Sequence, residues 1–295
     1  MAFFGKVRYN CNVCDHAASE AIIHFTKVCD NKCPFCIDRT NKGVSARTPN
    51  VEAITETLIG RAQFISEVTI SGGEPFLFMD SLIQLIKNIR SFAPHLKIDI
   101  MTACPKTCHD RFDDFKWVID NVDYIGLTPQ HSNELIAEKI RGHRSGYDRQ
   151  TFYRNIPHKE KFGINLNCWK GYLDTKEDIL TAVKHYNDMG FENIRICEMF
   201  DKDDLFVSIE EVLGIKMNSA FASGCSTPYN ITRMIPSFKG TFKIKRVCFF
   251  KCDKCKASVF DWIKMLTRWV VSKKYYFGVI HEDGTLAPYW LLCEK

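Results

Sequence analysis

Short apolar runs rich in β-branched residues alternate along this chain with amphipathic stretches of helical period. Six such runs predict strands over residues 21–25, 67–70, 97–101, 123–127, 163–167 and 193–196. Helical spacing of apolar residues predicts helices over 51–64, 81–92 and 175–189. Strands that alternate with helices form parallel βα units with right-handed crossovers. The fold class is therefore α/β, and a partial (β/α)6 TIM-like barrel fits the pattern better than an open sheet.

The length of the chain, 295 residues, corresponds to about two domains. We expect an N-terminal segment over 1–20, a barrel over 21–200 and a small cysteine-rich C-terminal extension over 201–295. Within the extension, apolar runs over 275–281 and 285–292 flank a turn and predict a β-hairpin. In a barrel the chemistry lies at the carboxyl ends of the strands, so the loops after the strands are the candidates for a site.

Composition excludes several classes of protein. Apolar residues make up 45% and charged residues 25% of the chain, which excludes disorder and collagen-like structure. No apolar run approaches the ~18 residues of a membrane span, and the first residues lack the features of a secretory signal. We therefore expect a cytoplasmic protein with no membrane partner. The net charge of +5 by itself identifies no partner.

Cysteine is the unusual residue, with 14 copies. Without a secretory signal, clustered cysteines indicate metal binding or redox chemistry rather than a disulfide scaffold. Cys29, Cys33 and Cys36 lie within eight residues directly after the first predicted strand. Iron–sulfur clusters usually take four thiolates, so three would leave one iron open to a substrate. The alternative is a zinc site completed by a distant cysteine or histidine.

A second motif, Ser71-Gly72-Gly73-Glu74-Pro75, follows the second predicted strand. Two glycines at a strand end let the backbone approach a ligand closely. Glu74 would present a carboxylate there, which suits an ammonium group. Taken alone, a Gly-Gly turn is weak evidence for a binding site.

Together, the C-x3-C-x2-C motif at Cys29, Cys33 and Cys36 and the GGEP motif at 72–75 resemble the radical S-adenosylmethionine (SAM) superfamily. The resemblance covers roughly residues 20–200. The heptapeptide over 71–77 is also similar, less specifically, to the viperin and molybdenum-cofactor GTP-cyclase branches.

The resemblance implies two cofactors, a [4Fe–4S] cluster on the three cysteines and SAM on the open iron. It implies that Glu74, with the backbone of Gly72 and Gly73, holds the SAM amino group, and that Phe35 lies near adenine. Further candidates for SAM contacts, each equally well explained as structural residues, are Ser71, Thr128, Gln130, Asn165, Asn167 and Ile196. Cys168 and Cys197 end the fifth and sixth strands, where a thiol could donate a hydrogen atom to a product radical.

The implied reaction is reductive cleavage of SAM to a 5′-deoxyadenosyl radical, which takes hydrogen from a substrate carbon. We expect a small-molecule or nucleotide substrate and an electron donor of the flavodoxin or ferredoxin type. Modification of a peptide or protein and modification of nucleic acid remain alternatives. Basic and imidazole side chains after the fourth strand are candidates for an anionic substrate group or belong to a solvated loop: His131, Arg141, His143, Arg144 and Arg149.

The C-terminal cysteines Cys248, Cys252 and Cys255 repeat the spacing of the first motif. They are similar to the auxiliary-cluster extensions of Twitch or SPASM type, which favours a second [4Fe–4S] cluster with Cys225 as the fourth ligand. A zinc site and unligated thiols are the alternatives. The basic run over 239–256 either contacts phosphate or forms a solvated face, so a zinc-stabilised nucleic-acid-binding protein without catalysis is the non-enzyme alternative.

Overall fold

The computed structural model describes residues 20–36, 48–199, 204–216, 226–247 and 279–287. Its strands are β1 (Glu20–Thr26), β2 (Glu67–Gly72), β3 (Lys97–Thr102), β4 (Tyr124–Leu127), β5 (Phe162–Cys168), β6 (Asn193–Met199), β7 (Ser226–Pro228), β8 (Thr241–Val247), β9 (Val279–His281) and β10 (Leu286–Ala287). Its α-helices are α1 (Val51–Ile59), α2 (Met79–Phe92), α3 (Lys106–Asp110), α4 (Phe112–Asn121), α5 (Glu134–Arg141), α6 (Arg149–Asn155), α7 (Lys176–Asp188) and α8 (Ile209–Leu213). Short 3₁₀ turns are η3 (Ala62–Phe64), η4 (Pro75–Phe78), η5 (Lys159–Lys161) and η6 (Ile231–Arg233).

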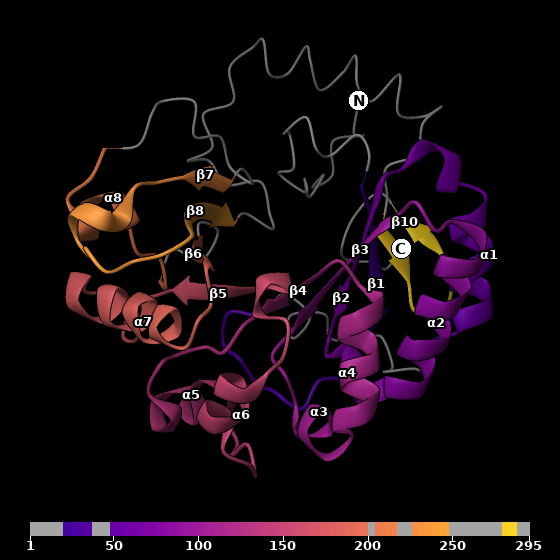
Figure 1. The fold of residues 1–295 in the computed structure, drawn as a ribbon, viewed down its shortest axis with the longest axis horizontal. Helices are drawn as coiled ribbons and strands as arrows, with labels where there is room; N and C mark the ends of the chain where they lie inside the picture. The colour runs from indigo at the N-terminus through magenta and orange to yellow at the C-terminus, as the bar shows by residue number, and fades with distance from the viewer. Residues whose placement is uncertain (1–19, 37–47, 200–203, 217–225, 248–278, 288–295) are drawn as a thin grey trace, which may run out of the picture.

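All strands belong to one ten-stranded sheet in the order β10-β9-β1-β2-β3-β4-β5-β6-β8-β7. From β9 to β8 the neighbouring strands pair in parallel, and β10 and β7 pair antiparallel at the two edges. Figure 1 shows the sheet curving across the molecule, with α1, α2 and α4 outside its first half and α7 outside its second. The expected α/β fold with a partial TIM-like barrel is confirmed.

Strand alternation divides the sheet into an apolar and a polar face. On β1, Ile23 and Phe25 are fully buried in the main core together with Ile54 and Leu58 of α1. Residues that point the other way, which we call the inner face, are mostly polar, as at His24 of β1 and Asp99 of β3. The helices therefore cover the outside of the sheet, and most polar side chains of the strands lie on its inner face.

All six predicted strands are present, as β1 to β6. The helix predicted over 51–64 is wrong at its end, because α1 ends at Ile59, Gly60 caps it, and a separate turn follows over Ala62–Phe64. Four helices between β3 and β5, α3 to α6, were not predicted. The longest of them has ten residues, so their apolar period is too short to recognise.

Residues after 200 contribute strands to both edges of the sheet: β8 pairs with β6, and β9 pairs with β1. The predicted hairpin around Asp283-Gly284 is present as β9 and β10. The division of the chain at residues 20 and 200 stays a prediction. The cysteines at 225, 248, 252 and 255 lie outside the described residues. No helix within the described ranges is long and apolar enough to cross a membrane.

Candidate functional site

The loop that follows β1 carries Cys29, Cys33 and Cys36, and none of them forms a disulfide within the described residues. Cys33 is buried, and the other two are half-buried. The loop is compact because the Cys36 N–H donates to the Cys33 carbonyl at 3.1 Å and the Asn31 N–H donates to Cys29 Sγ at 3.4 Å. Three soft sulfur donors thus lie in one short loop at the carboxyl end of a parallel strand.

The glycines after β2 dock directly against this loop. The Gly73 N–H donates to the Thr26 carbonyl at 2.6 Å, and the Glu74 N–H donates to the Val28 carbonyl at 2.8 Å. A Cβ on Gly73 would lie 2.2 Å from the Val28 carbonyl oxygen, and Gly72 has a φ of +120° that side chains rarely adopt. Both positions therefore require glycine, because the two motif backbones touch.

The carboxylate of Glu74 is 1% exposed and accepts three hydrogen bonds from the protein. Thr102 Oγ1 donates at 2.7 Å, the Ala103 N–H at 2.8 Å and the Phe76 N–H at 3.3 Å. Burial raises the pKa of Glu74 to about 7, although these hydrogen bonds act in the opposite direction. The predicted contact between Glu74 and an ammonium group stays a prediction. The two carboxylate oxygens of Glu74 already fasten the end of β2 to the end of β3.

The Cys29 thiol lies in the electrostatic field of this carboxylate. Burial and then the charge of Glu74 raise the pKa of Cys29 above its usual range. The protein by itself therefore favours the protonated thiol at this position. A metal that binds Cys29 has to displace the proton, as metals do at thiolate sites.

A small apolar cluster surrounds the other two cysteines. Cys33, Phe35, Ile140 and Trp169 are its buried members, and Cys36 packs against it. The Phe35 ring meets the Trp169 ring edge-on with centroids 5.3 Å apart, and Trp169 stacks on Tyr172 at 4.2 Å. Trp169 was missed by the sequence analysis, although its position directly after β5 could have revealed it. The cluster shields one side of the cysteine loop from water.

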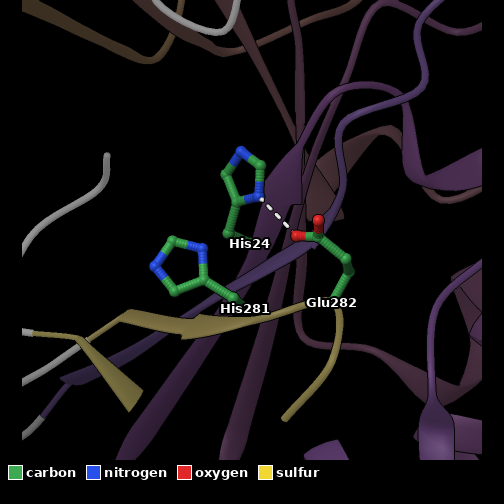
Figure 2. Close-up of side chains that lie close together, drawn as sticks. All are labelled: His24, His281 and Glu282. Carbon is green, nitrogen blue, oxygen red and sulfur yellow. Dashed lines mark ion pairs between the residues drawn. The ribbon is translucent and has the colours of Figure 1, made fainter. Parts of the chain in front are cut away.

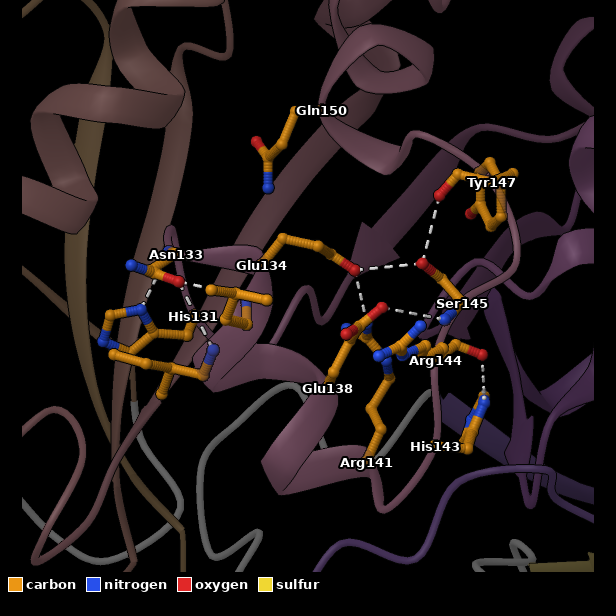
Figure 3. A network of polar contacts seen from close by, with 12 residues as sticks. His131, Asn133, Glu134, Glu138, Arg141, His143, Arg144, Ser145, Tyr147 and Gln150 are labelled. Atoms are coloured by element: carbon orange, nitrogen blue, oxygen red, sulfur yellow. Dashed lines mark hydrogen bonds and ion pairs between the residues drawn. The ribbon is translucent and has the colours of Figure 1, made fainter.

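The segment from α5 to α6 closes over the same loop. The Lys32 N–H donates to the Arg141 carbonyl at 2.6 Å, and His143 Nε2 lies 3.0 Å from Asn31 Oδ1. Figure 3 shows that Glu134 joins Arg141 and Ser145 in one polar network, and Ser145 in turn reaches the Tyr147 carbonyl. Residues more than 100 positions apart in the sequence are therefore in direct contact at the candidate site.

Several buried polar atoms at this end of the sheet have no hydrogen-bond partner within the described part of the chain. They include Nε and Nη1 of Arg141, which is 0% exposed, and Oε1 of Gln130, which is 4% exposed. Arg149 is 1% exposed and has the same two nitrogens unpaired. Unsatisfied buried donors are costly, which indicates groups held ready for a ligand. His131 is different, because its Nδ1 accepts from the Asn133 N–H at 2.9 Å and burial lowers its pKa.

The remaining predicted residues divide between the two faces of the sheet. By strand alternation Ser71, Asn165, Asn167 and Cys197 lie on the inner face, whereas Cys168 and Ile196 lie in the main core under the helices. Thr128 continues β4 and donates its N–H to the Thr102 carbonyl at 2.8 Å. The roles predicted for these residues stay predictions. The Cys197 side chain therefore lies on the inner face, whereas the Cys168 side chain does not.

A separate polar pocket of about 380 Å³ lies at the amino ends of the strands. Charged side chains of both signs line it, from Glu67, Lys97, Asp99, Asp123, Arg195 and Lys243. It is at the opposite end of the sheet from the cysteine loop and shares no residue with it.

Known proteins are similar to this chain in sequence and in fold. The family model of the radical SAM superfamily matches residues 23–199. The pyruvate formate-lyase-activating enzyme of Staphylococcus epidermidis is 25% identical over 199 residues, which cover 65% of this chain and 78% of the relative. The corresponding enzyme of Staphylococcus aureus is 24% identical over the same shares of both chains.

Solved structures share the fold. Streptococcus suis SuiB bound to S-adenosylmethionine superposes with a TM-score of 0.56 and 16% identity, over 92% of this chain and 60% of SuiB. The chain thus spans three fifths of the length of SuiB. The enzyme anSMEcpe with bound AdoMet superposes with a TM-score of 0.51 and 13% identity, over 93% of this chain and 75% of that protein.

Proposed function

Because the chain belongs to the radical SAM superfamily, we propose that it cleaves SAM at a [4Fe–4S] cluster held by Cys29, Cys33 and Cys36. Enzymes of this superfamily carry such a cluster and use SAM, and the chain is an enzyme. The observation that carries the residue assignment is the contact between the two motifs, in which the Gly73 N–H bonds to the Thr26 carbonyl at 2.6 Å. The non-catalytic zinc protein considered from the sequence is not retained.

The donor set fits the cluster. Three cysteines in one loop supply three thiolates, so one of four irons has no ligand from this loop and is available to SAM. Gly72 and Gly73 approach the start of the loop closely. Because they have no side chains, they present only backbone atoms beside it. This arrangement supports binding of the amino group of SAM at the motif after β2. We assign Glu74 to positioning, because its carboxylate ties this motif to Thr102 and Ala103.

When bound, the reduced cluster supplies the electron that cleaves SAM to methionine and a 5′-deoxyadenosyl radical, which takes a hydrogen atom from the substrate. The protein has to exclude water and other hydrogen donors from this step. Phe35 and Trp169 serve this purpose beside the cysteine loop, since both are buried in the apolar cluster. Of the two thiols predicted to quench a product radical, Cys197 is the better placed, on the inner face.

The unpaired nitrogens of Arg141 support a site for an anionic group at this end of the sheet. The carboxylate of SAM carries such a charge, and an Arg–carboxylate hydrogen bond is among the stronger polar contacts in proteins. Arg141 is held in place by Glu134 at one nitrogen and by the Lys32 N–H at its carbonyl. We therefore propose Arg141 as a SAM-binding residue that the sequence analysis assigned only to an anionic substrate group.

For the substrate, we propose a peptide or protein. The curated relatives are activating enzymes of another enzyme, and SuiB, whose fold this chain shares, has been solved with its precursor peptide SuiA. These findings support the polypeptide alternative over the small molecule or nucleotide first expected from the sequence. An electron donor of the flavodoxin or ferredoxin type remains part of the proposal.

An auxiliary cluster also remains part of the proposal. Three of its four candidate ligands, Cys248, Cys252 and Cys255, follow β8 in the sequence. Because β8 is parallel to β6, its carboxyl end lies at the same end of the sheet as the cysteine loop. This direction of β8 supports a second [4Fe–4S] cluster on Cys225, Cys248, Cys252 and Cys255, which lie outside the described residues.

Deuterium transfer tests the substrate class. The anaerobically reconstituted protein is incubated with SAM, a reductant and fully deuterated cell extract, separated by ultrafiltration into a polypeptide fraction and a low-mass fraction. We expect deuterium in the 5′-deoxyadenosine from the polypeptide fraction only, as read by mass spectrometry. Transfer from the low-mass fraction alone would favour the small-molecule alternative. Absence of any SAM cleavage would contradict the enzymatic proposal itself.

A further inference from the structure

Two histidines and a glutamate meet at the edge of the inner face, where β9 pairs with β1. They are His24 of β1, His281 of β9 and Glu282 of the following turn, and they are 1%, 0% and 3% exposed. Figure 2 shows the three side chains next to one another, on neighbouring strands. One ligand atom from each lies within 4.8 Å of the other two. Such burial is unusual for a carboxylate, which normally requires a partner charge or a metal.

The fold holds this cluster in place through backbone contacts. His24 and His281 are direct register partners in the parallel pairing of β1 with β9. The turn after β9 is fastened to α1, because the Asn50 N–H donates to the Glu282 carbonyl and Thr57 Oγ1 donates to the Gly284 carbonyl, each at 2.7 Å. The side chains are therefore presented by fixed backbone, as a preorganised ligand site needs.

The spacing of the Glu282 carboxylate fits a shared cation better than direct hydrogen bonds. Its Oε2 lies 3.5 Å from His24 Nδ1, and its Oε1 lies 3.5 Å from Lys27 Nζ. Both distances exceed the ~2.7–3.2 Å of ordinary hydrogen bonds. Oε2 has no hydrogen-bond partner within the described part of the chain. Two ligand atoms of a tetrahedral zinc ion with bonds of ~2.0–2.1 Å are ~3.3 Å apart, close to the separation of Oε2 and His24 Nδ1.

We propose that His24, His281 and Glu282 bind one zinc ion, without a ligand from Cys29, Cys33 or Cys36. Two imidazoles and one carboxylate are a ligand set typical of zinc. Lys27 forms an ion pair with the other carboxylate oxygen at 3.5 Å, and such an outer partner commonly orients a metal ligand. A zinc ion here joins β1 to a hairpin from the other end of the chain. Its binding free energy therefore stabilises the folded state and secures the β9–β10 edge of the sheet.

Zinc counting on the full-length protein with its cluster reconstituted tests the proposal. The protein is exposed anaerobically to Zn²⁺, desalted and analysed for zinc and iron per chain, as wild type and as His281→Gln and Glu282→Gln. Because glutamine nearly matches glutamate in shape, the second variant removes a ligand charge with little change in packing. We expect each variant to lose one zinc per chain, with the iron content unchanged, and to lose the rise in melting temperature that Zn²⁺ gives the wild type.

His158→Asn is the matched control. His158 also has two carboxylates nearby, Glu160 at 3.2 Å and Asp120 at 3.7 Å, but its side chain is 49% exposed. We expect this variant to keep the zinc content of the wild type. Equal zinc content in wild type, His281→Gln and Glu282→Gln would overturn the proposal, whatever the iron content and SAM cleavage show.

Cobalt identifies the ligands independently, because the many cysteines of this chain can also bind zinc. The Co²⁺ spectrum of the wild type minus that of Glu282→Gln is expected to contain d–d bands without a thiolate-to-cobalt charge-transfer band. A charge-transfer band in this difference would place the lost metal on cysteine and overturn the assignment.

Discussion

The carboxyl and amino ends of the sheet hold their polar groups in different ways. At the carboxyl end Glu74, Gln130 and Arg141 are 1%, 4% and 0% exposed, and two of them keep donors or acceptors unpaired. At the amino end Arg90 and Asp123 form an ion pair with side chains that are 27% and 46% exposed. Burying a polar group costs free energy of folding unless the group has a hydrogen-bond partner, whereas an exposed ion pair changes the stability little. The carboxyl end is therefore built for a ligand, and the amino end for stability in water.

The largest expected effect at the carboxyl end comes from Cys33→Ala. Removing a thiolate from the loop leaves two ligands for the cluster, so we expect the variant to lose the iron of this cluster and to abolish formation of 5′-deoxyadenosine. Iron analysis and chromatography of the products measure both. Cys108→Ala is the matched control, a thiol that is 0% exposed in the core. It is expected to cost about 1 kcal/mol of stability and to keep the iron. Activity retained by Cys33→Ala would contradict the cluster assignment.

Gly73→Ala tests the contact between the two motifs. The added Cβ would lie 2.2 Å from the Val28 carbonyl oxygen, so the backbone has to separate. We expect SAM cleavage to fall by up to ~10²-fold, because misplacement of a reacting group by about 1 Å has effects of this size. Stability should fall by about 2 kcal/mol.

Gly60→Ala is the control for this glycine. The atom nearest to a Cβ added at Gly60 would be the Thr57 carbonyl oxygen, at 3.9 Å, and the φ of Gly60 is −62°. Replacing a glycine in such a conformation by alanine usually stabilises a protein by about 0.5 kcal/mol. Equal activity of the Gly73 and Gly60 variants would show that the docking of the motifs does not matter for cleavage.

The difference between residues close together in the sequence and contacts between distant segments explains what the sequence could predict. Cys29, Cys33 and Cys36 lie within eight residues and Gly72-Gly73 follows one strand later, so spacing alone indicates their joint chemistry. Alternation along β5 also places Cys168 with Leu166 in the core, a signal that was available in the sequence. Arg141 and Trp169 reach the loop from distant segments, and His281 reaches His24 through the pairing of β9 with β1. Such contacts depend on strand order, which local periodicity does not determine.

Arg141→Met measures the contribution of the α5–α6 segment to SAM binding. It removes the unpaired nitrogens together with the nitrogen that bonds Glu134, and keeps most of the side-chain volume. We expect KM for SAM to rise about tenfold, the equivalent of ~1.4 kcal/mol, with a smaller change in kcat. Arg144→Met, at an exposed neighbour, should leave KM unchanged. A fall in kcat at constant KM would instead assign Arg141 to the substrate or to positioning of the loop.

Asp123→Asn tests the amino end, where the effect should be smallest. Burial alone would raise the pKa of Asp123, but the Arg90 guanidinium at 2.7 Å and the Ile98 N–H at 2.8 Å hold it below its ordinary value. A carboxylate whose pKa is lower in the folded state contributes stability above its unfolded pKa and loses that contribution as the pH falls through the folded pKa. We expect the wild type to be more stable by about 0.5 kcal/mol at neutral pH. This difference should shrink below pH ~4 in urea unfolding. SAM cleavage should be equal in both proteins, and a loss of cleavage would mean that the two ends of the sheet are coupled.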